Sequence, residues 1–173
     1  MNRIILIMII NLIINHTIFA QDWLEFQWHR DHYLQESYGL LAENIDDLLD
    51  IRDKYLESGK STSNSNKKVG NLVELETLIG IIESISDTKR CIDDIIYIFW
   101  IVEDGCGNSS SKENTIKFLS QKSQYMSLNI DNIKGFLFNT TNNQVINLGN
   151  DSIKIMKTAL VNNEKIISYY ESH

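Results

Sequence analysis

Apolar residues recur every three or four positions along most of this 173-residue chain, and the chain contains no proline. That spacing places apolar side chains on one face of an α-helix. Proline interrupts helix interiors, and a chain of this length ordinarily holds about eight or nine of them. The pattern therefore predicts an all-α fold, and Gln144–Leu148 is the only stretch that could form a strand.

The periodicity predicts four helices separated by polar segments. They are expected over residues 22–57, 72–102, 112–138 and 151–170. The small, polar stretch 58–71 predicts a flexible linker, and residues 104–111 and 139–150 predict two further breaks. The first two helices are the longest, so we expect a helical bundle with a long N-terminal hairpin, in one domain over residues 21–173.

In the second predicted helix the apolar residues can be aligned on one stripe, which we expect to face the core. They are Leu75, Ile79, Ile82, Ile85, Ile92, Ile95, Phe99 and Val102. From Ile95 to Val102 this helix is apolar nearly all round, which indicates burial on more than one side. This segment is therefore expected to lie at the centre of the fold or to form a surface for a partner.

Residues 1–20 have the composition of a secretory signal peptide. Arg3 gives a positive start, residues 4–14 are almost entirely apolar, and Ala20 is a small residue ahead of polar sequence. The apolar run is short for a span of about 30 Å of hydrocarbon. We expect export to the periplasm or cell surface, signal cleavage and no membrane span afterwards; an uncleaved N-terminal anchor is the alternative.

The chain is acidic, with 16 basic and 23 acidic residues and a net charge of −7, which loss of Arg3 with the signal would lower to −8. Binding to nucleic acid needs clustered basic residues, so this class of partner is excluded. One side of the first predicted helix is acidic, which is typical of a solvated face and less so of a divalent-cation site. Its residues are Asp46, Asp47, Asp50 and Asp53.

No nucleophile elbow, phosphate-binding loop or pair of Glu-x-x-His motifs occurs in the sequence. We therefore predict a protein that is not an enzyme and needs no cofactor. One set of residues has the spacing of a metal site: Glu25, His29, His32 and Glu36 are placed on one helical face. Imidazole and carboxylate groups bind zinc or copper, but a solvated polar face explains the same residues.

Cys91 and Cys106 would meet an oxidising compartment after export, where a disulfide is the first expectation. If Cys91 lies on a helix that continues to residue 103, it is about 18 Å from the end of that helix. Cys106 follows three residues later, within a reach of about 10 Å. A disulfide needs Cα atoms within about 7 Å. The two cysteines are therefore predicted to be unpaired within one chain, unless the helix breaks after Cys91.

Two groups of aromatic and apolar residues are candidates for protein contacts, because large aromatic side chains dominate interface hot spots. They are Trp23, Phe26 and Trp28 near the predicted mature N-terminus, and Ile95, Phe99 and Trp100 in the second helix. Packing within the fold is the alternative for both groups. Homo-oligomerisation is also compatible with these surfaces.

The order of these features resembles that of exported conjugal-transfer proteins related to minor pilins of type IV secretion. The matching features are Trp23–Trp28, Tyr33-Leu34, Tyr55–Gly59, and an apolar helix, polar turn and aromatic-ending helix over 130–138, 142–151 and 153–170. The acidic residue and arginine that usually follow the family's last turn are missing, since Ser152-Ile153-Lys154 stands there. Residues 72–106 match only as an amphipathic helix.

This resemblance implies a component of DNA-transfer machinery that works through contacts with other envelope subunits and has no catalytic residues. We accordingly predict an exported helical interaction protein of a conjugative or type IV secretion assembly. The alternatives are a small periplasmic bundle that binds a metal or ligand through Glu25, His29, His32 and Glu36, and a secreted effector or immunity-type protein.

Overall fold

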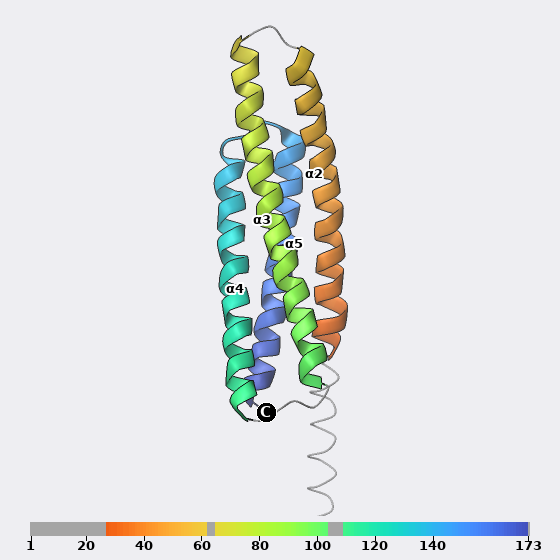
Figure 1. Cartoon of the computed structure of the whole chain (residues 1–173), viewed down its shortest axis with the longest axis vertical. Coiled ribbons are helices and arrows are strands. Elements are labelled where there is room, and N and C mark those ends of the chain that lie inside the picture. Colours follow the sequence, from red (N-terminus) through yellow and green to blue (C-terminus); the bar gives the residue numbers. More distant parts are fainter. Residues whose placement is uncertain (1–26, 62–64, 104–108, 173) are drawn as a thin grey trace, which may run out of the picture.

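The computed structural model describes residues 27–61, 65–103 and 109–172, and these residues form a bundle of four long α-helices (Figure 1). The elements are a short π-helix η1 (His29–Leu34), α2 (Gln35–Ser61), α3 (Ser65–Glu103), α4 (Ser109–Leu137) and α5 (Asn143–Ser172). The described ranges contain no β-strand. The all-α bundle predicted from the periodicity is confirmed.

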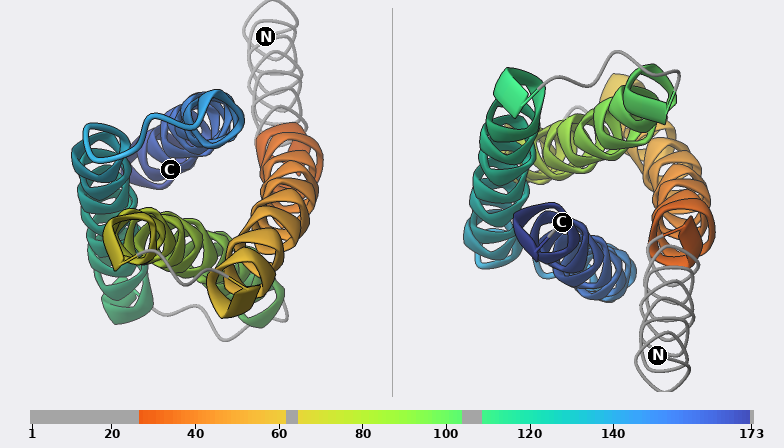
Figure 2. Two further views of the ribbon diagram at one scale, coloured as in Figure 1. Left: turned by 90° about the horizontal axis from the view of Figure 1, so that it is seen from above. Right: turned by 90° about the horizontal axis from the view of Figure 1, so that it is seen from below.

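Consecutive helices run antiparallel, and α5 closes the ring by packing against α2 and η1 (Figure 2). The diagonal pair α3 and α5 also meets, whereas within the described ranges α2 and α4 do not. Helices in such an up-and-down bundle bury one apolar stripe each against their neighbours. In the described parts, no helix is both long and apolar enough to cross a membrane.

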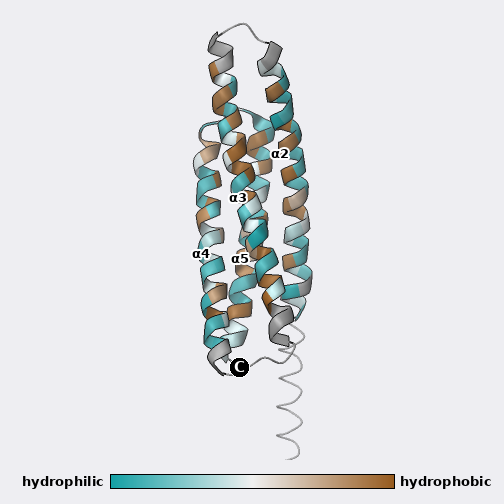
Figure 3. Ribbon diagram, viewed as in Figure 1, coloured by the Kyte–Doolittle hydropathy of each residue, from teal (hydrophilic) through white to brown (hydrophobic). Residues whose placement is uncertain are grey.

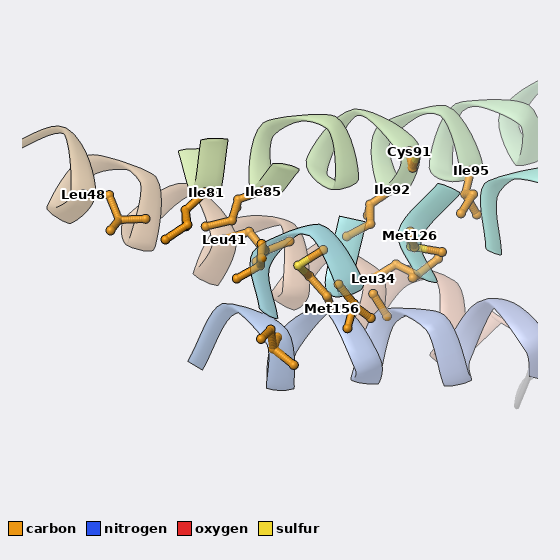
Figure 4. Packing of buried hydrophobic residues seen from close by; sticks show 14 of the residues in the cluster. Leu34, Leu41, Leu48, Ile81, Ile85, Cys91, Ile92, Ile95, Met126 and Met156 are labelled. Atoms are coloured by element: carbon orange, nitrogen blue, oxygen red, sulfur yellow. The ribbon is translucent and has the colours of Figure 1, made fainter. Parts of the chain in front are cut away.

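The core is continuous along the bundle and receives apolar residues from η1 and from every α-helix (Figure 4). Its fully buried large side chains are Leu34, Leu41, Leu48, Leu78, Ile81, Ile85, Ile92, Ile95, Leu119, Met126 and Ile133. Figure 3 shows these apolar stripes alternating with hydrophilic residues along each helix. Hydrophobic burial is thus the main stabilising contribution to this fold.

The stripe predicted for α3 is correct for Ile82, which packs against the core, and wrong for Ile79. The side chains of Phe99 and Val102 lie outside the described residues. Ile85, Ile92 and Ile95 are buried, but Leu78 and Ile81 enter the core while Ile79 is exposed. Residues 78–82 are apolar on nearly every side apart from Gly80, so periodicity alone does not define which face turns inward. The positions of α2 and α4 around the helix decide it.

The linker predicted over residues 58–71 is mostly helical. α2 continues to Ser61 and α3 begins at Ser65, so residues 62–64 alone separate the two described helices. The Ser58 hydroxyl donates to the backbone oxygen of Tyr55, and the Asn71 side-chain amide donates to the Ser58 hydroxyl at 3.1 Å. Polar side chains that suggest a break in the sequence therefore join the two helices of the hairpin.

The second polar connection is also shorter than predicted. α5 begins at Asn143, eight residues before the expected start at Asp151, and Gln144–Leu148 is helical instead of extended. The Asn142 side-chain oxygen accepts hydrogen bonds from the backbone N–H groups of Gln144 and Val145, at 2.9 and 3.4 Å. Asn142 is therefore the N-cap of α5, a role for which asparagine is well suited.

The turn between α4 and α5 is attached to both helices of the hairpin. The Glu74 carboxylate accepts hydrogen bonds from the Thr140 hydroxyl and from the backbone N–H of Thr141. The Asn142 amide donates to the Tyr55 hydroxyl at 3.0 Å. Residues 56–61 of α2 and 65–73 of α3 extend beyond this turn and form a projecting tip (Figure 1).

Candidate interaction surfaces

Large apolar side chains are exposed on the projecting tip. We call Leu56, Val69, Leu72 and Val73 the tip surface. Val69 and Leu72 expose 61% and 57% of their area, and the other two are also exposed. Several exposed apolar residues on one part of a folded protein are candidates for an interaction site.

The geometry of α3 explains why this part of the helix faces water. Val69, Leu72 and Val73 are three and four residues apart, so they share one face. Leu78 lies nine residues after Val69, which places it about half a turn round the helix, and it is fully buried. The tip surface therefore faces away from the core. Phe138, in the turn at the same end of the bundle, is 90% exposed.

The N-terminal aromatic candidates are placed only in part. Trp28 is exposed and its ring stacks on the ring of His32, with centroids 4.5 Å apart, while Tyr33 meets it edge to face. Trp23 and Phe26 lie outside the described residues. An interaction role for this group stays a prediction.

The second group of interaction candidates lies near the end of α3. Ile95 has no exposed area and contributes to the core, so it is not available to a partner in this fold. Residues 95–102 were expected either at the centre of the fold or on a surface for a partner. The burial of Ile95 agrees with the first alternative. The side chains of Phe99 and Trp100 lie outside the described part of the chain, and their role stays a prediction.

The metal set predicted on the first helix is only partly in view. Glu25 and the side chain of His29 are outside the described residues. His32 and Glu36 are both exposed, with 3.9 Å between the imidazole Nε2 and the carboxylate Oε2. Among the side chains that the structure describes, no group of three potential metal ligands comes together. These two residues form a weak surface pair.

Cys91 is buried against α4 and its thiol is free. Burial raises the pKa of this thiol above its ordinary value, and the Lys122 ammonium offsets the rise in part. A buried thiol with a raised pKa is a poor nucleophile. α3 continues without a break to Glu103, so the alternative of a helix break after Cys91 is wrong. Cys106 is not among the described residues.

Two grooves that the sequence did not indicate lie along the α2–α5 side of the bundle. The lower groove, of about 400 Å³, is lined by Tyr33, Lys154, Lys157, Thr158, Val161, Asn162 and Lys165. The upper groove, of about 280 Å³, is lined by Asp47, Asp50, Ile51, Lys54, Gln144, Asn147 and Leu148. The lower groove has one signal in the sequence, the recurrence of lysine along α5, which only the packing of α5 against η1 turns into a groove.

Comparison of the chain with known protein families, with curated proteins and with solved structures finds no match. The surfaces of the bundle and the pattern of the sequence are therefore the basis for inferring a function.

Proposed function

We propose that this chain is an exported, non-enzymatic interaction protein, and that its tip surface binds another subunit of an envelope assembly. The observation that carries the proposal is the exposure of Leu56, Val69, Leu72 and Val73 on a part of the hairpin that the other two helices do not cover. Covering such a surface with a partner removes apolar area from water.

The mode of binding follows from the shape of the tip. A rigid pair of helices presents its apolar residues at spacings of three and four, which suits packing against a helix or an apolar groove of the partner. Glu76 and Glu57, exposed on the same two helices, provide a polar rim around the apolar centre. Export and a place in a conjugative or type IV secretion assembly rest on residues 1–20 and on the sequence resemblance.

The test is recovery of partners from the envelope fraction of the organism that carries the gene. The protein, tagged at its C-terminus, is crosslinked and captured, and the co-purified subunits are identified by mass spectrometry. The tip variant Val69→Gln/Leu72→Gln should lower recovery at least about tenfold, because loss of a central apolar anchor typically costs more than 1 kcal/mol.

A matched control is available on α4, where Tyr125 and Leu128 expose 58% and 56% of their area. The variant Tyr125→Gln/Leu128→Gln makes the same kind of change on another helix and should retain full recovery. Capture of pilus or secretion-channel subunits that depends on the tip supports the proposal. Equal recovery with both variants, or an unaccompanied bait, contradicts it.

A further inference from the structure

The two edges of the α2–α5 face carry charges of opposite sign. On α2, Glu36, Glu43 and Asp50 are exposed and seven residues apart, which is about two helical turns, so they lie in one line. Asp50 lines the upper groove between α2 and α5. The whole line therefore borders this face, and we call it the acidic edge.

The opposite edge belongs to α5. Lys154, Lys157 and Lys165 are exposed and line the lower groove, whose lining residues include no carboxylate. None of the three forms an ion pair with another side chain in the described ranges. We call these three residues the basic edge. The lining of the lower groove is therefore basic in the described structure, although the protein as a whole is acidic.

The two edges overlap along the bundle. The Asn44 amide donates to the Ser152 hydroxyl at 2.9 Å, which fixes the register of the antiparallel helices α2 and α5. Glu43 is one residue from this bond on α2, and Lys154 is two residues from it on α5. Glu36, eight residues before Asn44, lies level with the interval between Lys157 and Lys165.

We infer that this face binds a second copy of the chain, with a two-fold axis parallel to the bundle. Rotation about that axis exchanges the edges, so the acidic edge of each copy lies over the basic edge of the other. Each ion-pair contact then occurs twice. This inference concerns a face other than the tip surface and does not rest on the proposed function.

Apolar residues are also available on this face. Leu40 lies between Glu36 and Glu43 on α2, and Val161 lies between Lys157 and Lys165 on α5; both are exposed. In the dimer they sit among the ion pairs and lose contact with water, which adds a hydrophobic contribution to the electrostatic one.

The size of the face sets the strength of the contact. Two helices, each about 10 Å across, over about 30 Å of length present roughly 600 Å² per copy. The pair would bury about 1,200 Å² in total, at the lower end of stable interfaces. The dimer is therefore reversible, and because its charges are near the surface, added salt weakens it.

The experiment measures self-association of the purified protein, obtained by expression of the full chain, by sedimentation velocity over a concentration series. At low salt the protein should form a reversible dimer whose dissociation constant rises at least about tenfold in 0.5 M NaCl. Two charge reversals then test the edges: Glu36→Lys/Glu43→Lys on the acidic edge and Lys154→Glu/Lys157→Glu on the basic edge. Each variant alone should be monomeric, whereas an equimolar mixture should dimerise because the edges again differ in sign.

Lys117→Glu/Lys134→Glu is the matched control, since both lysines are exposed on α4 and the change in charge equals that of the basic-edge variant. It should dimerise as the parent does. Circular dichroism establishes that each variant is folded. A parent that stays monomeric at every concentration, variants that dimerise unaltered, or a mixture that stays monomeric would each overturn the inference.

Discussion

Helices α2 and α3 run through the body of the bundle and on into its projecting tip, but the apolar residues at the tip are exposed whereas those of the core are buried. In the body, Leu41, Leu48 and Ile85 have no contact with water. In the tip, Val69 and Leu72 are among the most exposed apolar residues of the described structure. The helices do not differ in kind between the two regions, and what differs is the presence of α4 and α5 beside them.

At the tip, apolar residues of the hairpin are exposed because the neighbouring helices α4 and α5 end before this level. The turn between α4 and α5 is tied to Glu74 and Tyr55, and past that level the hairpin has only its own two helices. A two-helix segment has little interior to fill. Its apolar residues contribute little to the stability of the monomer, so we expect them to act in binding.

The largest effect should come from truncating the core of the body. Leu48→Ala removes a fully buried side chain and leaves a cavity, which should lower the free energy of unfolding by about 2–5 kcal/mol. Urea denaturation followed by circular dichroism measures this change. A loss below 1 kcal/mol would contradict close packing of the core around Leu48.

The next effect concerns the boundary between the two regions. Glu74→Ala removes the acceptor for Thr140 and Thr141 and leaves the turn unattached, so stability should fall by about 1–3 kcal/mol. Glu76→Ala is the control, because Glu76 is exposed two residues later on the same helix, and it should change stability by less than about 0.5 kcal/mol. Equal losses from both variants would mean that the turn is held by other contacts.

Two substitutions of glycine by alanine in the body should change stability by smaller amounts and in opposite directions. A Cβ at Gly80 would lie 2.3 Å from the Phe136 ring, so Gly80→Ala should destabilise by about 1–2 kcal/mol. A Cβ at Gly39 meets nothing within 4 Å, so Gly39→Ala should stabilise by about 0.5–1 kcal/mol through helix propensity. Thermal unfolding of the two variants tests this difference, and stabilisation by both would show that α3 and α4 are not in close contact at this point.

The smallest effect is expected at the tip itself. Leu72→Gln should change the free energy of unfolding by less than about 0.5 kcal/mol, because the side chain is already exposed. Denaturation of this variant beside Leu48→Ala makes the comparison direct. If Leu72→Gln were as costly as the core substitution, the tip would belong to the folded body and the proposed binding role would lose its support.

Much of the fold could be predicted from the sequence, because local periodicity reports which residues can share a helical face. The four helices, and the core positions Ile85, Ile92 and Ile95, follow from spacings of three and four. The absence of proline adds to this, since no residue in the chain forces a break in a helix.

The candidate surfaces depended on contacts that no local pattern contains. The polar stretches around Ser58 and Asn142 are typical of breaks, yet Asn71 donates to Ser58 and Asn142 donates to Tyr55, which attaches both stretches to a neighbouring helix. Residues 78–82 are apolar nearly all round the helix. Leu78 and Ile81 are buried because the helices packed against α3 cover that side of it. The sequence by itself thus determined that the chain is helical and which positions can be buried. Only the tertiary structure decided which apolar residues remain exposed at the tip and which charges lie along the two edges of the α2–α5 face, because both depend on where separate helices end and in what register they pack.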